Sequence, residues 1–449
     1  YRPEEDSPEI TYVKKRRQEL QGYVPKRIVR NPKITTPSDE LFKEFYDGTD
    51  GREVSTTMVY VRILTKLLKD KEIGKLIVPI VPDEARTFGM ESLFRQVGIY
   101  STNGQLYEPV DRDSLLYYKE AKNGQILEEG ITEDGSMASF IAAGTAYATH
   151  GINAIPFFTY YSMFGFQRFG DLAWAAADMQ CKGFLIGGTA GRTTLAGEGL
   201  QHQDGQSHVL AHSIPTVKAY DPAFAYELAV IIRDGIHRMY ELQEDCYYYI
   251  TVMNENYAMP EMPKGSKEGI IKGMYKYKSG KKDNKLKANL LGSGSILNET
   301  LKAQEILEKD YNVSANVWSV TSYKNLHYDA LDIERWNRMN PAKTKKKNYI
   351  QEITKGEEGI FISASDYSQI LNDSISKWFP NTVTTLGTLG FGRSESREAL
   401  RDFFEVDAKH IVYTTLYALF EEGKIDKDVL VKAATDLNIN LKKHSPINS

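Results

Sequence analysis

The sequence predicts an α/β protein with two domains, each built around a mainly parallel sheet. Short apolar runs, such as residues 184–187 and 247–252, alternate with longer segments whose apolar residues recur at helical spacing. Strands that helices cover on both faces have this pattern. The chain also has 449 residues, 41% of them hydrophobic, enough for two or three cores of ordinary size.

The first 51 residues are rich in charge and proline, with one weakly helical stretch at residues 12–20. We therefore expect residues 1–51 to form a lead-in or linker that runs over the surface. The sequence begins with Tyr1 and not with methionine, and polar residues follow at once, which suggests a start in the middle of a longer gene product.

The first domain is expected at residues 52–258. Apolar residues at helical spacing between Met58 and Leu68 predict a helix, and the apolar run 76–81 predicts the strand that follows it. The same alternation predicts strands at 154–161, 184–187 and 247–252, and helices at 137–148, 171–179 and 222–240.

Residues 259–285 mix proline, glycine and lysine, so we expect an interdomain connection with a short edge strand. The second domain is expected at residues 286–449. It begins with a strand at 288–291, a Gly-Ser turn and a helix at 298–309. Strands are also expected at 316–320, 359–363 and 383–386, and helices at 368–378, 396–404, 408–422 and 426–437.

Composition excludes several classes of partner. The formal net charge is only −4, so no long-range field favours nucleic acid or an anionic membrane. No apolar run is long enough to span a bilayer. The two cysteines, Cys181 and Cys246, lie outside any metal-binding spacing, which fits a reducing, cytoplasmic compartment. We expect the lysines near residue 345 to be solvated, although they also suit an anionic partner.

A glycine-rich segment, residues 183–212, follows a predicted buried strand and contains three histidines. Ligands bind where parallel strands end. The segment lacks the lysine of a phosphate-binding P-loop, and its histidines lack the spacing of a zinc site. The residues between the histidines look like loop. Packing is the ordinary role of a histidine, but His202 lies where packing does not require one.

Three other clusters each have two interpretations. Asp83 and Glu84 follow an apolar strand and belong either to an ion pair at a helix start or to a site. Glu133 either caps a helix or points into an apolar cleft, where desolvation would raise its pKa. The aromatic run 157–169 is either core or the wall of a pocket for a flat ring.

Four blocks in order resemble one family: PDEARTFGMESLFRQVGIY, YYSMFGFQRFGDLAWAAADMQ, GFLIGGTAGRTTLAGEGLQHQDGQSH and YYYITVMNENYAMPEMPKG. GFGRSESREALRDFFEVDA adds a fifth. They are similar to the homodimeric bacterial pyruvate dehydrogenase component. The resemblance implies a pyrimidine-type, thiamin diphosphate-binding domain at 52–258 and a transketolase C-terminal-like domain at 286–449, the middle and last of the family's three domains.

The resemblance also implies roles for individual residues. Glu133 would hydrogen-bond the aminopyrimidine of thiamin diphosphate and Phe164 would stack on it. Tyr161 and His202 would face substrate, with Glu198, Asp83 and Glu84 as support. Residues 105–118 resemble a segment that orders over the active site.

The family's magnesium motif, Gly-Asp-Gly followed by Asn, is not found in this sequence. We therefore expect Mg²⁺ to be held by another domain, no metal to be held by this chain, and the chain alone to be inactive. Pyruvate, the lipoyl domain of dihydrolipoyl acetyltransferase and a second copy of the chain are the expected partners. Two alternatives stay open: another thiamin enzyme, of the transketolase or 2-oxo acid dehydrogenase type, and a non-catalytic scaffold.

Overall fold

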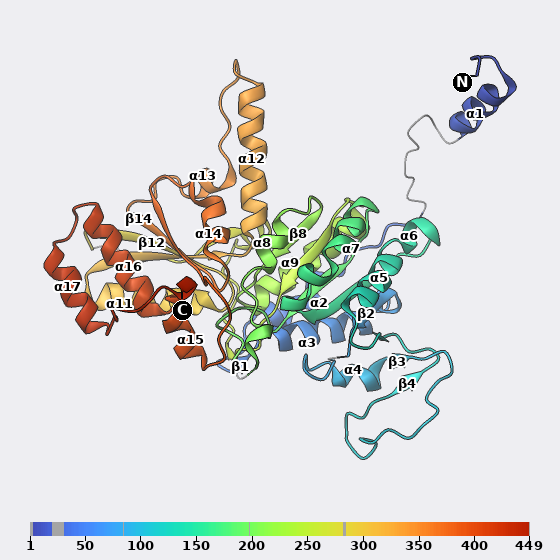
Figure 1. The fold of residues 1–449 in the computed structure, drawn as a ribbon, viewed down its shortest axis with the longest axis horizontal. Helices are drawn as coiled ribbons and strands as arrows, with labels where there is room; N and C mark the ends of the chain where they lie inside the picture. Colours follow the sequence, from blue (N-terminus) through green and yellow to red (C-terminus); the bar gives the residue numbers. More distant parts are fainter. Residues whose placement is uncertain (1–2, 20–30, 84, 197, 282–283, 449) are drawn as a thin grey trace.

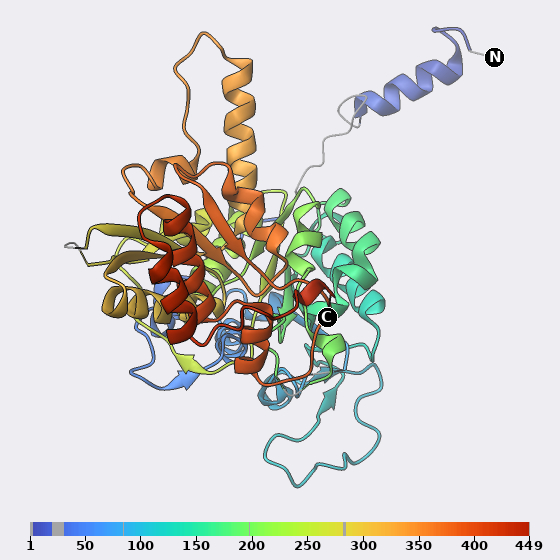
Figure 2. The same cartoon turned by 60° about the vertical axis from the view of Figure 1, so that its left-hand side comes forward.

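The computed structural model describes residues 3–19, 31–83, 85–196, 198–281 and 284–448. Two large sheets lie side by side, each covered by helices, as Figure 1 shows. In Figure 2 the second sheet and the C-terminal helices come forward, and helix α12 projects from one end of the molecule. The long loop around β3 and β4 projects from the opposite end in both views.

The first sheet has six strands in the order β5-β2-β6-β7-β9-β8, and all its pairs are parallel. Its central strands are apolar along their whole length because helices cover both faces. All but the last residue of β6 are buried. The strands are β2 Ile77–Val81, β5 Leu127–Glu128, β6 Ile155–Tyr161, β7 Phe184–Gly188, β8 Val217–Tyr220 and β9 Tyr247–Thr251.

The helices of the first half bury an apolar face, and two of them begin at a residue whose side chain caps the helix. Helix α3 Thr56–Lys69 starts where the Ser55 side chain accepts a hydrogen bond from the Met58 amide. The predicted apolar face is buried except for Met58, whose side chain is 49% exposed. The other helices are α4 Glu91–Gln96, α5 Glu133–Gly144, α6 Ala146–Thr149, α7 Phe166–Asp178, α8 Ser207–His212 and α9 Ala225–Ile236.

The N-terminal lead-in is more structured than the sequence suggests. Helix α1 Pro8–Glu19 buries no side chain, as a surface segment would. Helix α2 Asp39–Tyr46, in contrast, buries Phe42 and Phe45 in the core of the first half. The expectation of a surface-running segment is therefore wrong for α2, because two phenylalanines three residues apart give this short helix an apolar face.

Residues 259–285 join the two sheets. Strand β10 Tyr257–Ala258 pairs with β1 Glu53–Val54, and this pair brings the two ends of the first half together. After helix α10 Lys267–Lys272, strand β11 Met274–Lys278 lies antiparallel to β13 at the edge of the second sheet. The predicted edge strand is thus confirmed.

The second sheet has the order β11-β13-β12-β14-β15, parallel except for β11. The strands and helices predicted for this half are confirmed, with small differences at their ends. They are β12 Leu286–Gly292, α11 Ile296–Asp310, β13 Val313–Val320, β14 Ile360–Ala364, α14 Gln369–Ser376, β15 Val383–Leu386, α15 Arg397–Phe404, α16 Ala408–Glu421 and α17 Lys427–Asp436.

Helix α12 Tyr323–Met339 is absent from the sequence-based assignment. Its outer half projects from the body (Figure 1). The returning chain, with α13 Tyr349–Ile353 beyond it, carries the lysine run, which is exposed as expected. Lys343 and Lys346 lie over the ring of Trp336, with Nζ 5.6 and 4.1 Å from the ring centre.

The two halves share a continuous interior. Leu297 and Val317 of the second half belong to the core cluster of the first. The Asp221 amide donates to the Thr321 carbonyl at 2.8 Å. The Ser322 hydroxyl donates to the Ala219 carbonyl at 2.6 Å, so the edge strand β8 is bonded to the second half. Within the described part of the chain, no helix is both long and apolar enough to cross a membrane.

Candidate active site

The candidate site lies at the carboxyl ends of the first sheet's strands. From β2 the chain goes first to β5 on one side and then to β6 on the other, so the connections reverse direction at β2 and β6. Ligands of open parallel sheets bind at this reversal. Asp83 follows β2, Tyr161 ends β6, and the loop that carries Glu198 and His202 follows β7.

Glu133 is the first residue of α5 and is buried, with 8% of its surface exposed. The helix is capped by its neighbour, since the Thr132 side chain accepts a hydrogen bond from the Gly135 amide. Glu133 itself accepts a hydrogen bond on Oε1 from Arg168 Nη1 at 2.8 Å. Glu133 is therefore not the cap of this helix, as one interpretation of the sequence had it. The cleft of the other interpretation is not wholly apolar, because Arg168 forms part of its wall.

The aromatic wall consists of Tyr161, Phe164 and His202. The His202 ring centre is 4.8 Å from that of Tyr161 and 5.1 Å from that of Phe164. The Arg168 guanidinium lies 4.1 Å from the centre of the Phe164 ring. The structure therefore brings a buried carboxylate, a cation and three flat rings together, an arrangement suited to a planar, hydrogen-bonding ligand.

The loop after β7 places Glu198 beside His202, with 4.0 Å between Glu198 Oε2 and His202 Nδ1. His202 Nδ1 is buried and has no hydrogen-bond partner among the described residues. A buried ring nitrogen without a partner carries a desolvation cost that a ligand would relieve. His202 Nδ1 can therefore accept a hydrogen bond from a bound ligand.

Two acids lie at the ends of adjacent strands. Asp83 is exposed just beyond β2, and Glu128 ends β5. Burial, together with the negative charge of Asp83, raises the pKa of Glu128 to about 7. Glu84 lies outside the described residues. Neither Glu128 nor Arg168 was assigned a role from the sequence, although Glu128 follows the same strand-end rule and Arg168 lies within the aromatic run.

The other two histidines of the glycine-rich segment lie on helix α8, so the expected loop between them is wrong in part. His208 Nε2 is 2.9 Å from Thr251 Oγ1, and burial lowers the pKa of His208 to about 3. His212 packs against His327 of α12, with 4.7 Å between ring centres. Both have packing roles away from the aromatic wall.

The segment at residues 105–118 extends from the body near β3 Ile99–Tyr100 and β4 Glu120–Ala121 (Figure 1). Val110 and Leu106 on it are exposed. Its far end is bonded back to the body, since Arg95 Nη1 donates to the Leu115 carbonyl at 3.1 Å and Arg86 Nη2 donates to the Leu116 carbonyl at 3.3 Å. The resemblance to a segment that closes over the site stays a prediction.

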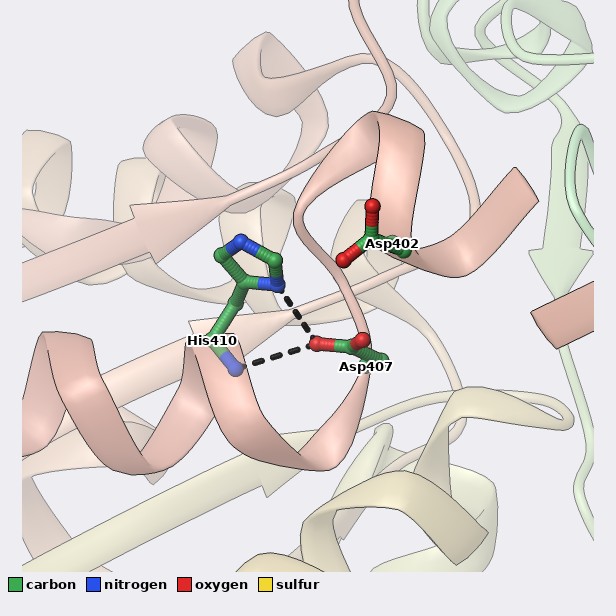
Figure 3. A group of neighbouring side chains, drawn as sticks. All are labelled: Asp402, Asp407 and His410. Atoms are coloured by element: carbon green, nitrogen blue, oxygen red, sulfur yellow. Dashed lines mark hydrogen bonds and ion pairs between the residues drawn. The ribbon is translucent and has the colours of Figure 1, made fainter. Parts of the chain in front are cut away.

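Among the described residues, one group of side chains has metal-ligand chemistry: Asp402, Asp407 and His410 of the second half (Figure 3). Lys409 Nζ lies 2.5 Å from Asp402 and 3.9 Å from Asp407, and Lys443 Nζ lies 3.8 Å from Asp402, so two lysines already offset the charge of the two acids. Asp407 also caps α16 by accepting from the His410 amide and lies 2.6 Å from His410 Nδ1. These contacts show that the group serves to cap the N-terminus of α16.

Comparison with solved structures identifies the fold class of this chain. A transketolase from Leishmania mexicana matches 86% of this chain with a TM-score of 0.63 at 15% identity, over 48% of its own length. A split-gene transketolase chain, described as an inactive β4 tetramer, matches 82% of this chain and 98% of its own, with a TM-score of 0.54 at 16% identity. The chain thus has a transketolase-like α/β fold, as predicted.

The family follows from the sequence. The family of the pyruvate dehydrogenase E1 component middle domain matches residues 33–260, and the transketolase-like C-terminal domain matches residues 273–407. The Pseudomonas aeruginosa pyruvate dehydrogenase E1 component is 53% identical over all of this chain, and the Escherichia coli K12 protein is 50% identical over 98% of it. The chain belongs to the pyruvate dehydrogenase E1 component family and spans about half the length of these relatives.

Proposed function

We propose that this chain supplies the aminopyrimidine side of a thiamin diphosphate site in an enzyme that decarboxylates pyruvate and acetylates a lipoyl group. The observation that supports this most directly is the buried Glu133 carboxylate, whose partner Arg168 lies over the ring of Phe164, together with the unpartnered Nδ1 of His202. A flat, nitrogen-rich ring needs such a pairing of a carboxyl group with an aromatic face.

The residues present fit the cofactor. Bound thiamin diphosphate would supply a nucleophilic carbon and an electron sink for decarboxylation. Glu133 would hydrogen-bond the aminopyrimidine, and Phe164 would stack on it. Tyr161 and His202 would face pyruvate, and Glu198 would fix the orientation of the His202 ring. Asp83, Glu84 and Glu128 would line the approach.

The diphosphate and Mg²⁺ would be held by residues that this sequence does not contain, because no Gly-Asp-Gly motif is present in it. Charge-assisted contacts and the metal give a diphosphate most of its affinity. We therefore propose that the chain alone neither binds the cofactor tightly nor turns over pyruvate. A homodimer, the lipoyl domain of dihydrolipoyl acetyltransferase as acetyl acceptor, and a cytoplasmic location complete the proposal.

The test is Glu133→Gln in a preparation that decarboxylates pyruvate. We expect turnover to fall by about 10² to 10⁴, the usual contribution of general acid or base catalysis. Glu129→Gln, at an exposed glutamate just beyond β5, is the matched control and should keep the unmutated rate. An unchanged rate in Glu133→Gln refutes the assignment. Turnover of a ketose phosphate or 2-oxoglutarate in place of pyruvate would refute the substrate.

A further inference from the structure

The loop at residues 189–206 carries Glu198 and His202 but receives much of its support from the second half of the chain. It leaves β7 and ends at α8, both in the first half. The ring of His202 touches Tyr161 and Phe164 of its own half. Backbone groups on either side of these residues are bonded to the second half, first by Asp366 and then by residues 390–397.

Asp366, which follows β14, holds the start of the loop. Its two carboxylate oxygens accept four hydrogen bonds, from the amides of Thr193 and Thr194 at 2.8 and 3.0 Å and from their hydroxyls at 2.7 and 2.5 Å. Asp366 is fully buried. Gly191 has a φ of +92°, and a Cβ atom there would lie 2.3 Å from Asp366 Oδ2. The loop is thus shaped to fit this carboxylate closely.

Residues 390–397 hold the rest of the loop. Arg397 Nε donates to the Thr194 carbonyl at 2.6 Å, and the Ser394 hydroxyl donates to the Glu198 carbonyl at 3.0 Å. Gln203, next to His202 in sequence, is 1% exposed. Its Oε1 accepts from the Arg393 amide at 2.7 Å, and its Nε2 donates to the Leu195 carbonyl at 3.1 Å.

These contacts hold the chain on both sides of His202. Glu198 Oε2 and His202 Nδ1 are 4.0 Å apart, so a small shift of either backbone segment changes the pair. A displacement of about 1 Å at a site costs on the order of 10²-fold in rate. We propose that the second domain positions the substrate-facing wall, with Gln203 and Ser394 as positioning residues for Glu198 and His202. This inference rests on the proposed function for its kinetic consequence only.

The first test is hydrogen–deuterium exchange of the whole chain, which needs no cofactor. Gln203→Met removes both side-chain hydrogen bonds and keeps the side chain's length. Since each bond contributes about a 3- to 10-fold difference in an equilibrium, amides of residues 193–206 should exchange about 10- to 100-fold faster. The control is Gln304→Met, which removes a buried bond from Gln304 to the Ala315 carbonyl, 2.6 Å long, in the second half.

Ser394→Ala provides a milder variant should Gln203→Met not fold, and Ser394→Thr should restore the bond. Ser394→Ala should speed exchange of the same segment by about threefold. Its control is Ser376→Ala, which removes a hydroxyl-to-backbone bond of the same kind, from Ser376 to the Asp373 carbonyl at 2.9 Å, outside the loop contacts. Equal exchange of residues 193–206 in the two alanine variants would overturn the proposal, as would a uniform rise across the chain.

The second test separates positioning from stability by kinetics. In a preparation active on pyruvate, Gln203→Met should lower kcat/KM for pyruvate by about tenfold or more and leave the affinity for thiamin diphosphate unchanged. Faster exchange with unchanged pyruvate kinetics would overturn the positioning role. If the unmutated enzyme shows no pyruvate chemistry, the proposed function fails, and the exchange experiment alone still decides whether the second domain fixes the loop.

Discussion

Glu128 should make the stability of this protein depend on pH near neutrality. Burial and the neighbouring Asp83 raise the pKa of Glu128 from 4.5 to about 7. Because the pKa is higher in the folded state, the folded state keeps the proton between pH 4.5 and 7 while the unfolded state loses it. The free energy of unfolding therefore falls as the pH rises through this window, and the loss is complete above about pH 7.

The size of the effect follows from the shift. A difference between 4.5 and about 7 corresponds to an upper limit of about 3 kcal/mol. The side chain is only partly buried and keeps some contact with water, so we expect about 1–2 kcal/mol. Glu128→Gln, which mimics the protonated form, should raise the free energy of unfolding by this amount at pH 8 and by much less at pH 5.

Urea unfolding at pH 5, 6, 7 and 8, followed by circular dichroism, measures the effect. Glu129→Gln is the matched control, since Glu129 is exposed and its substitution should give nearly the same small change at each pH. Asp83→Asn should reproduce part of the gain, because it removes the neighbouring negative charge. A Glu128→Gln variant that is no more stable than the unmutated chain at pH 8, or equally stabilised at every pH, would refute the reasoning.

Two further predictions concern buried groups. Gly191→Ala should lower the free energy of unfolding by more than about 3 kcal/mol, because it adds a clash with Asp366 to the strain of a φ of +92°. Gly130→Ala, at φ +81° with nothing within 4 Å, should lower it by only about 1 kcal/mol. Equal losses of stability in thermal unfolding would contradict this prediction. Glu227 accepts hydrogen bonds from two backbone amides and from the hydroxyls of Tyr275 and Ser319, so Glu227→Gln should cost about 1 kcal/mol and Glu227→Leu about 3 kcal/mol or more. Urea unfolding measures both, and a Leu variant as stable as the Gln variant would contradict it.

The elements that could be predicted are those whose own residues carry the pattern. Strands β6, β7 and β9 are unbroken apolar runs, and the helices that cover them repeat at helical spacing. Strand β8 has four residues and includes Lys218, so nothing local marks it as buried. Helix α12 buries only four of its seventeen residues, too few for a periodic apolar face. Its first half packs against β8 and α14, contacts that no local pattern encodes.

The site shows the same division. The strand-end rule led to the segment of His202, and the resemblance assigned roles to it, to Glu133 and to the aromatic wall. The ion pair between Glu133 and Arg168 depends on how α5 packs against α7, which no local pattern encodes. The raised pKa of Glu128 likewise requires β5 to lie beside β2, so that Glu128 and Asp83 approach each other.

The contacts between the two halves imply that neither half keeps the site geometry by itself. Glu227 of α9 accepts hydrogen bonds from Tyr275 and Ser319 of the second sheet, and Asp366 of the second half accepts four from the site loop. Separation of the two halves would leave these carboxylates and backbone amides without partners or expose them to water. Each buried group left unpaired lowers the stability of the fold by about 1–3 kcal/mol. The second domain is therefore a structural part of the site, because the loop that bears His202 is bonded to it.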